Sequence, residues 1–386
     1  MNIVIAIDSF KGSLSTLQAG NAAAAGIQRV YPNAETQIFP IADGGEGTVD
    51  ALVSGLHGTY RTAKVSDPLG REISARYGIL PNNTAVIEMA AASGLPLLSS
   101  AKRNPLHTTT YGFGQLIRDA IGYGCRNFIL GIGGSATNDG GVGCLQALGF
   151  DFLDKNGKQV AFGAKGLSDI VHISDENAMP ELKECSFHVA CDVKNPLCGE
   201  NGCSAVFAPQ KGADAEMIAK MDKDLRHFAE LTKQITPDAD PDHEGAGAAG
   251  GLGFGLMSYL HATLESGIDL IIRETGLEEA IRYADLVITG EGCLDAQTAM
   301  GKAPVGIAKI AKKYGKPVIA FSGVVKDGAA DCNAVGIDAF FPILRSVGTP
   351  EDAMDTENAA KNLSDTAEQV FRLIRTFPKK EDTLCK

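Results

Sequence analysis

The chain has 386 residues, of which 44% are hydrophobic and 21% are charged, as in an average globular protein. This composition excludes a wholly disordered chain, and the length predicts two folded domains. The formal net charge is -12, from 35 Lys and Arg against 47 Asp and Glu, which excludes a broad positive surface for nucleic acid or for an anionic membrane.

Short buried strands are predicted along the chain, and each is followed, directly or after one residue, by Gly, Ala, Asp or Ser. They are Asn2–Ile7 and residues 36–41, 84–89, 127–131, 186–191, 285–289 and 317–321. Longer helical patterns separate these strands, an alternation typical of parallel sheets that are covered by helices. We therefore predict an α/β fold in which ligands bind beyond the carboxyl ends of the strands.

Two composition breaks predict the domain boundaries. Residues 66–70 form a turn-rich step, and residues 236–253 form a Pro- and Asp-rich loop that runs into a glycine-rich stretch. We predict a discontinuous Rossmann- or flavodoxin-like α/β domain of residues 1–68 and 254–386, and an inserted second α/β domain of residues 69–253. Both sheets are expected to be largely parallel, with the active site in the cleft between the domains.

Targeting and disulfide patterns are missing from the sequence. No signal peptide precedes the first strand, and no stretch reaches the roughly 18 to 20 apolar residues of a membrane span. The nine cysteines are an odd number spread over a long chain, which favours reduced thiols over a disulfide framework. We therefore expect a cytoplasmic protein with no membrane or nucleic-acid partner; a homo-oligomer is compatible with the sequence.

Glycine clusters follow several of the predicted strands, at residues 44–47, 131–141, 245–253 and 290–292. Glycine lets backbone N–H groups approach an anion closely, so the clusters indicate phosphate binding. Each cluster alone is also typical of a tight strand-to-helix turn. No cluster matches a P-loop or a dinucleotide fingerprint, which argues against an NAD-dependent oxidoreductase.

Charged side chains accompany the glycines. The carboxylates are Asp8, Asp43, Glu46, Asp139, Asp192, Glu291 and Asp295. Carboxylates at strand ends can hold Mg²⁺ or accept the proton of a hydroxyl nucleophile, and each can also cap the next helix. Three lysines in similar loops, Lys11, Lys211 and Lys302, could neutralise a phosphate or a substrate carboxylate. Together these residues predict phosphoryl transfer.

Seven motifs resemble those of the type I glycerate kinases in their order and spacing. They are Asp8-Ser9-Phe10-Lys11 and residues 42–48, 89–95, 131–141, 191–197, 209–212 and 288–292. The resemblance spans nearly the whole chain, although Cys293 stands where many members have Arg. It implies phosphorylation of D-glycerate by ATP with Mg²⁺, usually at the 2-hydroxyl, by two α/β domains that face each other across a cleft. A glycerate 3-kinase, a kinase of a related hydroxy acid and a non-catalytic nucleotide or sugar-acid sensor stay open as alternatives.

Residue types and the resemblance together predict a role for each matching residue. Asp192 is the predicted base, and Lys11 and Asp43 complete the catalytic group. The predicted metal ligands are Asp43, Glu291 and Asp295, although the sequence does not fix which carboxylate plays which role. The residues predicted to bind glycerate are Ser9, Ser93, Gly133, Gly134, Ser135, Thr137, Asn138 and Asn195. The residues predicted to bind the nucleotide are Gly44, Gly45, Gly47, Lys211, Gly290, Gly292 and Lys302.

Overall fold

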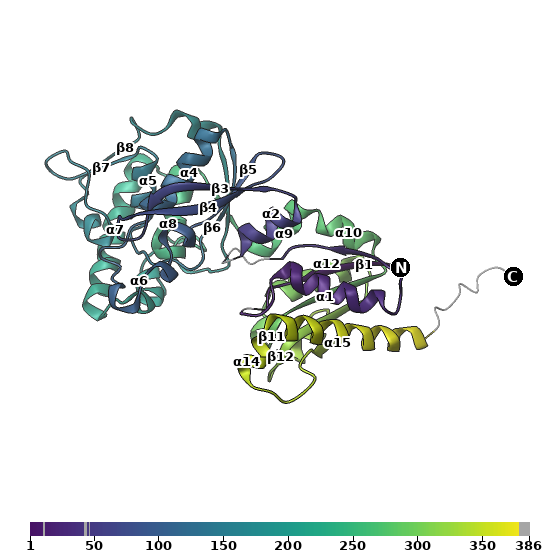
Figure 1. The fold of residues 1–386 in the computed structure, drawn as a ribbon. Helices are drawn as coiled ribbons and strands as arrows, with labels where there is room; N and C mark the ends of the chain where they lie inside the picture. Colours follow the sequence, from purple (N-terminus) through teal and green to yellow (C-terminus); the bar gives the residue numbers. More distant parts are fainter. Residues whose placement is uncertain (11, 42–44, 46, 378–386) are drawn as a thin grey trace. The chain divides into compact units, whose positions relative to one another are not determined.

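The computed structural model describes residues 1–10, 12–41, 45 and 47–377 of the chain. Of the residues with a predicted role, Lys11, Asp43 and Gly44 lie outside this part. The chain forms two compact units (Figure 1). Unit 1 consists of Met1–Ala42 and Ile271–Lys386, and unit 2 consists of Asp43–Leu270. The predicted domain boundaries after residues 68 and 253 stay a prediction.

Unit 1 contains a fully parallel sheet of five strands in the order β13-β12-β11-β1-β2. The strands are β1 (Asn2–Ile7), β2 (Glu35–Ile38), β11 (Leu286–Leu294), β12 (Val318–Val325) and β13 (Ala339–Pro342). In the centre of the sheet, Ile5 pairs with Ile288 and Ile288 with Ile319, and Ile5 and Ile288 are fully buried. The register places the carboxyl end of β1 opposite Gly290, four residues before the end of β11.

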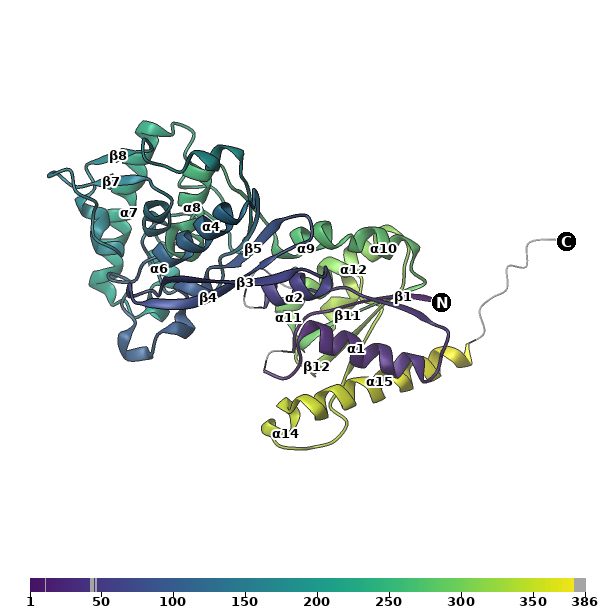
Figure 2. The same cartoon turned by 45° about the horizontal axis from the view of Figure 1, so that its top comes forward.

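Two long helices cover one face of this sheet. Helices α1 (Thr16–Gln28) and α15 (Thr356–Thr376) lie side by side in both views (Figures 1 and 2). They pack closely because Gly26 has no Cβ, which would come within 2.0 Å of the carbonyl oxygen of Ser364. Ser15 starts α1 with a capping box, in which Ser15 and Gln18 satisfy each other's backbone N–H group. The remaining helices of unit 1 are α10 (Leu277–Tyr283), α11 (Ala296–Ala299), α12 (Ala303–Lys313), α13 (Asp331–Ala334) and α14 (Pro350–Met354).

Unit 2 contains a mixed sheet of six strands in the order β10-β9-β6-β5-β4-β3. The strands are β3 (Thr59–Ser66), β4 (Glu72–Ile79), β5 (Thr84–Glu88), β6 (Asn127–Gly131), β9 (Ser186–Ala190) and β10 (Thr263–Glu265). Strands β5, β6, β9 and β10 are parallel, whereas β3, β4 and β5 are joined in antiparallel pairs. The α/β class is therefore confirmed, but only one of the two main sheets is fully parallel. The antiparallel part arises because residues 67–70 form a tight turn, in which Asp67 accepts hydrogen bonds from the N–H groups of Leu69 and Arg71.

Helices and a small antiparallel pair of strands complete unit 2. The small sheet consists of β7 (Asp151–Leu153) and β8 (His172–Ser174). The helices are α2 (Thr48–Gly55), α3 (Ala90–Ser93), α4 (Tyr111–Tyr123), α5 (Val142–Ala147), α6 (Cys203–Phe207), α7 (Ala215–Ile235) and α8 (Ala248–Leu260). Helix α9 (Gly267–Thr275) crosses from unit 2 into unit 1. In the described part of the chain, no helix has the length and hydrophobicity needed to cross a membrane.

The observed strands match the predicted ones unequally. Strands β1 and β6 have the predicted bounds, whereas the strand predicted to end at residue 289 continues through Gly290 and Gly292 to Leu294. The glycines allow this extension, because a Cβ on Gly290 would come within 2.0 Å of the carbonyl oxygen of Phe321 on β12. Gly290 is therefore needed for strand packing, whatever it binds.

Candidate functional site

The described residues with predicted roles fall into two groups, one in each unit. The group in unit 1 is Ser9, Gly290, Glu291, Gly292, Asp295 and Lys302. The group in unit 2 is Gly45, Gly47, Ser93, Gly133, Gly134, Ser135, Thr137, Asn138, Asp192, Asn195 and Lys211. Most members of both groups lie near the carboxyl ends of parallel strands, where α/β sheets bind their ligands.

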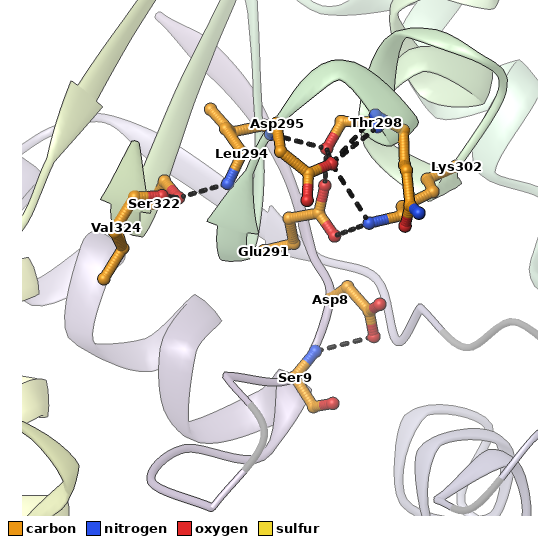
Figure 3. A network of polar contacts seen from close by, with 10 residues as sticks. Asp8, Ser9, Glu291, Leu294, Asp295, Thr298, Lys302, Ser322 and Val324 are labelled. Atoms are coloured by element: carbon orange, nitrogen blue, oxygen red, sulfur yellow. Dashed lines mark hydrogen bonds and ion pairs between the residues drawn. The ribbon is translucent and has the colours of Figure 1, made fainter. Parts of the chain in front are cut away.

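In unit 1, two predicted metal ligands lie around one lysine (Figure 3). Glu291 projects from β11, and Asp295 follows the end of that strand. Lys302 Nζ lies 3.9 Å from Glu291 Oε2 and 3.5 Å from Asp295 Oδ1. Glu291 is 8% exposed, so its carboxylate is held largely away from water. This arrangement places two carboxylates and one cation together near the carboxyl end of β11, a central strand of the parallel sheet.

Thr298 orients the carboxylate of Glu291. Its hydroxyl donates to Glu291 Oε1 over 2.5 Å, and Thr298 itself is fully buried on α11. Thr298 is not among the residues predicted from the sequence. The available signal was the spacing Asp295-x-x-Thr298, which is typical of a capping box at the start of a helix.

Asp295 also has a structural role as the N-cap of α11. Its Oδ1 accepts hydrogen bonds from the N–H groups of Gln297 and Thr298. Burial alone would raise the pKa of Asp295, but the Thr298 N–H group and the nearby Lys302 ammonium lower it below its usual value. Asp295 is therefore held in its ionised form directly after the end of β11.

The end of β1 meets the middle of β11. The Asp8 N–H group donates to the carbonyl oxygen of Gly290 over 2.9 Å, and the Ser9 N–H group donates to Asp8 Oδ1 over 2.7 Å. Figure 3 shows Asp8 beneath Glu291, at the ends of the paired strands. Ser9 is thus placed beside the Glu291 group by the backbone.

A metal ion can be held by the protein alone or can be bound together with a nucleotide. The described residues fit the second case, a magnesium ion bound with a nucleotide, better than the first. Among them, no three His, Cys, Asp or Glu side chains are close enough to hold a metal ion together. Mg²⁺ commonly takes only one or two protein carboxylates and completes its shell with water and phosphate oxygens. Glu291 and Asp295 could supply such a pair, because both face the same cation, Lys302.

In unit 2, a pocket of about 410 Å³ lies beyond the ends of β6 and β9. Six residues with predicted roles line it: Gly45, Gly133, Gly134, Ser135, Asp192 and Lys211. Gly47, Ser93, Thr137, Asn138 and Asn195 are not among its lining residues. Of the residues of unit 2 that were predicted to bind a ligand or to act in catalysis, some line this pocket and others do not.

Lys211 is the most buried charged side chain of this pocket, with 1% of its surface exposed. Its Nζ donates to Ser135 Oγ and to the carbonyl oxygen of Thr137, over 2.7 Å in each case. Because burial disfavours the charged form, the pKa of Lys211 is lowered to about 8. The lysine therefore links the glycine-rich loop that follows β6 to the short turn at residues 209–211.

Three predicted glycerate ligands have fully buried side chains. Ser93, Thr137 and Asn138 are fully buried, and the Asn138 amide donates to Ser204 Oγ over 2.9 Å. Ser93 Oγ, Thr137 Oγ1 and Asn138 Oδ1 have no hydrogen-bond partner within the described part of the protein. These side chains are therefore buried in unit 2 and are not part of the pocket lining.

Asp192 follows β9 and is exposed, so its carboxylate can reach a ligand in the pocket. Its Oδ1 accepts a hydrogen bond from the Gly267 N–H group over 3.1 Å, which restricts its orientation. Asn195 donates through its amide to the carbonyl oxygen of Asn201 and so holds its own loop.

Asp139 is buried and acts within the fold. It accepts hydrogen bonds from the N–H group and hydroxyl of Thr110 and from the Gly141 N–H group, and burial raises its pKa. Its contacts fix the glycine-rich loop against the start of α4, away from the lining of the pocket.

Known proteins resemble this chain over nearly its full length. The model of the glycerate kinase family matches residues 3–375. A glycerate kinase of Haemophilus influenzae is 47% identical over 375 residues, which cover 97% of this chain and 99% of that protein. A glycerate 2-kinase of Escherichia coli is 48% identical over 354 residues, which cover 92% of this chain and 93% of that protein.

A solved structure agrees with these relatives. The crystal structure of a provisionally named glycerate kinase 2 from Salmonella typhimurium LT2 superposes with a TM-score of 0.90 and 44% sequence identity. The match covers 97% of this chain and 98% of that one. By sequence and by fold, the chain belongs to the glycerate kinase family.

Proposed function

We propose that this protein transfers the terminal phosphoryl group of ATP to the 2-hydroxyl of D-glycerate and forms 2-phosphoglycerate and ADP. Membership of the glycerate kinase family makes the protein a kinase and implies the use of ATP. The choice of the 2-hydroxyl is supported by the name of the Escherichia coli relative, glycerate 2-kinase. The structural observation that carries the proposal is the pocket of unit 2, which has one lysine and one aspartate in its wall.

Asp192 is the proposed general base. As the 2-hydroxyl oxygen attacks the terminal phosphorus, the carboxylate of Asp192 accepts the hydroxyl proton and ADP leaves. The exposure of Asp192 and its position in the lining of the pocket support this role. The hydrogen bond from the Gly267 N–H group to Oδ1 holds the carboxylate in place at the wall of the pocket.

Most of the remaining predicted residues keep their proposed roles in binding. Mg²⁺ bound with ATP would neutralise charge on the phosphates, and Asp43, Glu291 and Asp295 are its proposed ligands. Lys302 would face the nucleotide phosphates together with Gly44, Gly45, Gly47, Gly290 and Gly292. Ser9, Lys11 and the residues around Ser135 would face the acid. The placement of the active site in a cleft between domains stays a prediction.

A ³¹P NMR time course of the purified protein with MgATP and D-glycerate tests the proposal. We expect signals of ADP and 2-phosphoglycerate, identified against authentic 2- and 3-phosphoglycerate. A signal of 3-phosphoglycerate would reject the proposed regiochemistry. Unchanged ATP with D-glycerate, followed by turnover with a related hydroxy acid such as tartronate, would reject the substrate. Unchanged ATP with every hydroxy acid would favour a sensor that binds without catalysis.

A further inference from the structure

We propose that Lys211 determines the specificity of the acid subsite, in which it supplies the positive charge that binds the substrate carboxylate at the Gly133–Ser135 wall of the unit 2 pocket. The sequence prediction assigned Lys211 to the nucleotide instead. The new assignment rests on the proposed function, because it concerns the acid that this kinase phosphorylates.

The first argument is that Lys211 is a buried cation with neutral partners. Its ammonium donates to a hydroxyl, Ser135 Oγ, and to a carbonyl, Thr137 O. It forms no ion pair with a carboxylate of the described chain; the Asp139 carboxylate acts on it from a distance, but burial outweighs this effect and lowers the pKa of the lysine. A buried charge is costly unless an opposite charge compensates it, so the ligand is the natural source of that charge.

The second argument is the charge of the pocket wall. Among the described lining residues, Lys211 is the sole cation and Asp192 is the sole carboxylate. One cation matches the single negative charge of a carboxylate. A triphosphate carries several negative charges and would meet Asp192 in the same pocket, with one lysine to balance them.

The third argument is the chemistry of a 2-hydroxy acid, whose hydroxyl carbon is bonded directly to the carboxyl carbon. A pocket for such a molecule needs a cation for the carboxylate and a base near the adjacent hydroxyl. Lys211 and Asp192 supply these two groups in the walls of one small pocket. The pocket therefore favours small monocarboxylic 2-hydroxy acids as substrates.

Ser135 connects Lys211 to the ligand. Its hydroxyl accepts a hydrogen bond from Lys211 Nζ, so its own proton is free to be donated into the pocket that it lines. The N–H groups of the glycine-rich loop can add further donors. Ser135→Ala should therefore weaken acid binding less than the loss of Lys211.

The test compares D-glycerate with D-glyceramide, in which a neutral amide replaces the carboxylate. Binding is measured by calorimetry in the absence of ATP for the wild type and for Lys211→Met, which has a similar length and no charge. We expect the wild type to bind glycerate much more tightly than glyceramide. In Lys211→Met the affinity for glycerate should fall by roughly 10- to 150-fold, as for a lost hydrogen bond to a charged group. The ratio between the two ligands should then approach one.

A parallel titration with ATP separates the two sources of negative charge. If Lys211→Met weakens ATP binding and leaves glycerate binding intact, the lysine serves a nucleotide phosphate and the proposal is wrong. An unchanged ratio of glycerate to glyceramide affinity would assign Lys211 a purely structural role and would also overturn it. The control is Lys233→Met, because Lys233 is an exposed lysine on α7 of the same unit.

Two further results need their own interpretation: a Lys211→Met variant that does not fold, and a wild type that binds glycerate without turnover. If Lys211→Met does not fold, Ser135→Ala tests the same subsite, and glycerate binding equal to that of the wild type would reject the proposal. If the wild type binds glycerate through Lys211 but gives no phosphoglycerate, the proposed function fails while the acid subsite stands.

Discussion

Thr298 donates its hydroxyl proton to Glu291, and the two oxygen atoms lie 2.5 Å apart at the end of β11. Thr298 is fully buried, so this bond fixes one oxygen of the carboxylate and turns the other toward Lys302. Hydrogen bonds of this kind orient carboxylates that receive metal ions and tune their affinity.

Thr298→Val should weaken the response of the enzyme to magnesium. Valine keeps the shape of threonine but cannot hold Glu291 Oε1, so the Mg²⁺ concentration that gives half of the maximal rate should rise by about 10-fold. Steady-state rates at varied Mg²⁺ measure this change. Thr298→Ser retains the hydroxyl and should behave like the wild type; equal Mg²⁺ responses of all three proteins would contradict the role of Glu291.

Asp192→Asn should abolish catalysis and preserve acid binding. Asparagine retains the oxygen that accepts from the Gly267 N–H group but cannot take up a proton at neutral pH. We expect kcat to fall by about 100- to 10,000-fold, the usual contribution of a positioned base. Calorimetry with D-glycerate should still show binding. The control is Asp238→Asn, because Asp238 is an exposed carboxylate of the same unit. Turnover at the wild-type rate would remove Asp192 from the mechanism.

The affinity for glycerate should decrease at alkaline pH. The pKa of Lys211 is lowered to about 8, so this lysine loses its proton, and with it its charge, as the pH rises through that value. The titratable groups that act on it are Cys203 on α6 and Asp139 after β6, and Asp192 shares the pocket wall. Above pH 8 the KM for glycerate should rise by up to about 10-fold per pH unit, while the KM for ATP should not follow it. Lys211→Met should give a flat profile, and a flat profile in the wild type would show that the charge of Lys211 is not used.

Gly290→Ala should destabilise unit 1 irrespective of any ligand. The new Cβ would come within 2.0 Å of the carbonyl oxygen of Phe321, so β11 and β12 would have to separate. We expect a loss of about 3 kcal/mol in the free energy of unfolding, measured by urea denaturation. Gly122→Ala is the matched change, because Gly122 lies within helix α4 and its added Cβ would meet no atom within 4 Å apart from its chain neighbours and the backbone of that helix. That variant should gain about 0.5 to 1 kcal/mol. Equal stability of the two variants would contradict the close packing at Gly290.

The sequence predicts the elements whose signals are local. Strand β1 is a continuous apolar run that ends before Asp8, and β6 is bounded by a turn and by Gly133, so both were predicted with their observed bounds. The extension of β11 through Gly290 was missed because glycine is typical of turns. Its reason is the close approach of β12, which is a property of the partner strand and not of the segment itself.

The candidate site shows the same limit. The motifs contain Ser135 and Lys211, but their hydrogen bond joins residues 76 positions apart and is not visible in either motif. Ser93, Thr137 and Asn138 belong to the same motifs and are fully buried. The conformation of a glycine-rich loop decides which of its polar residues faces the ligand. In this loop the conformation depends on distant contacts, such as the hydrogen bond from the Thr110 N–H group to Asp139. The family resemblance predicts the chemistry without fixing these orientations.

The strand order of unit 1 also constrains how the chain folds during synthesis. Strand β1 is made first, but β11, its neighbour in the centre of the sheet, begins only at Leu286. At a translation rate of 5 to 20 residues per second, the interval lasts about 14 to 56 s, and all of unit 2 is made within it. Throughout that time one edge of an almost wholly apolar strand stays without its partner, which favours pairing with other chains. Any factor that covers this strand edge until Leu286 and the rest of β11 emerge would therefore lower the risk of pairing with other chains.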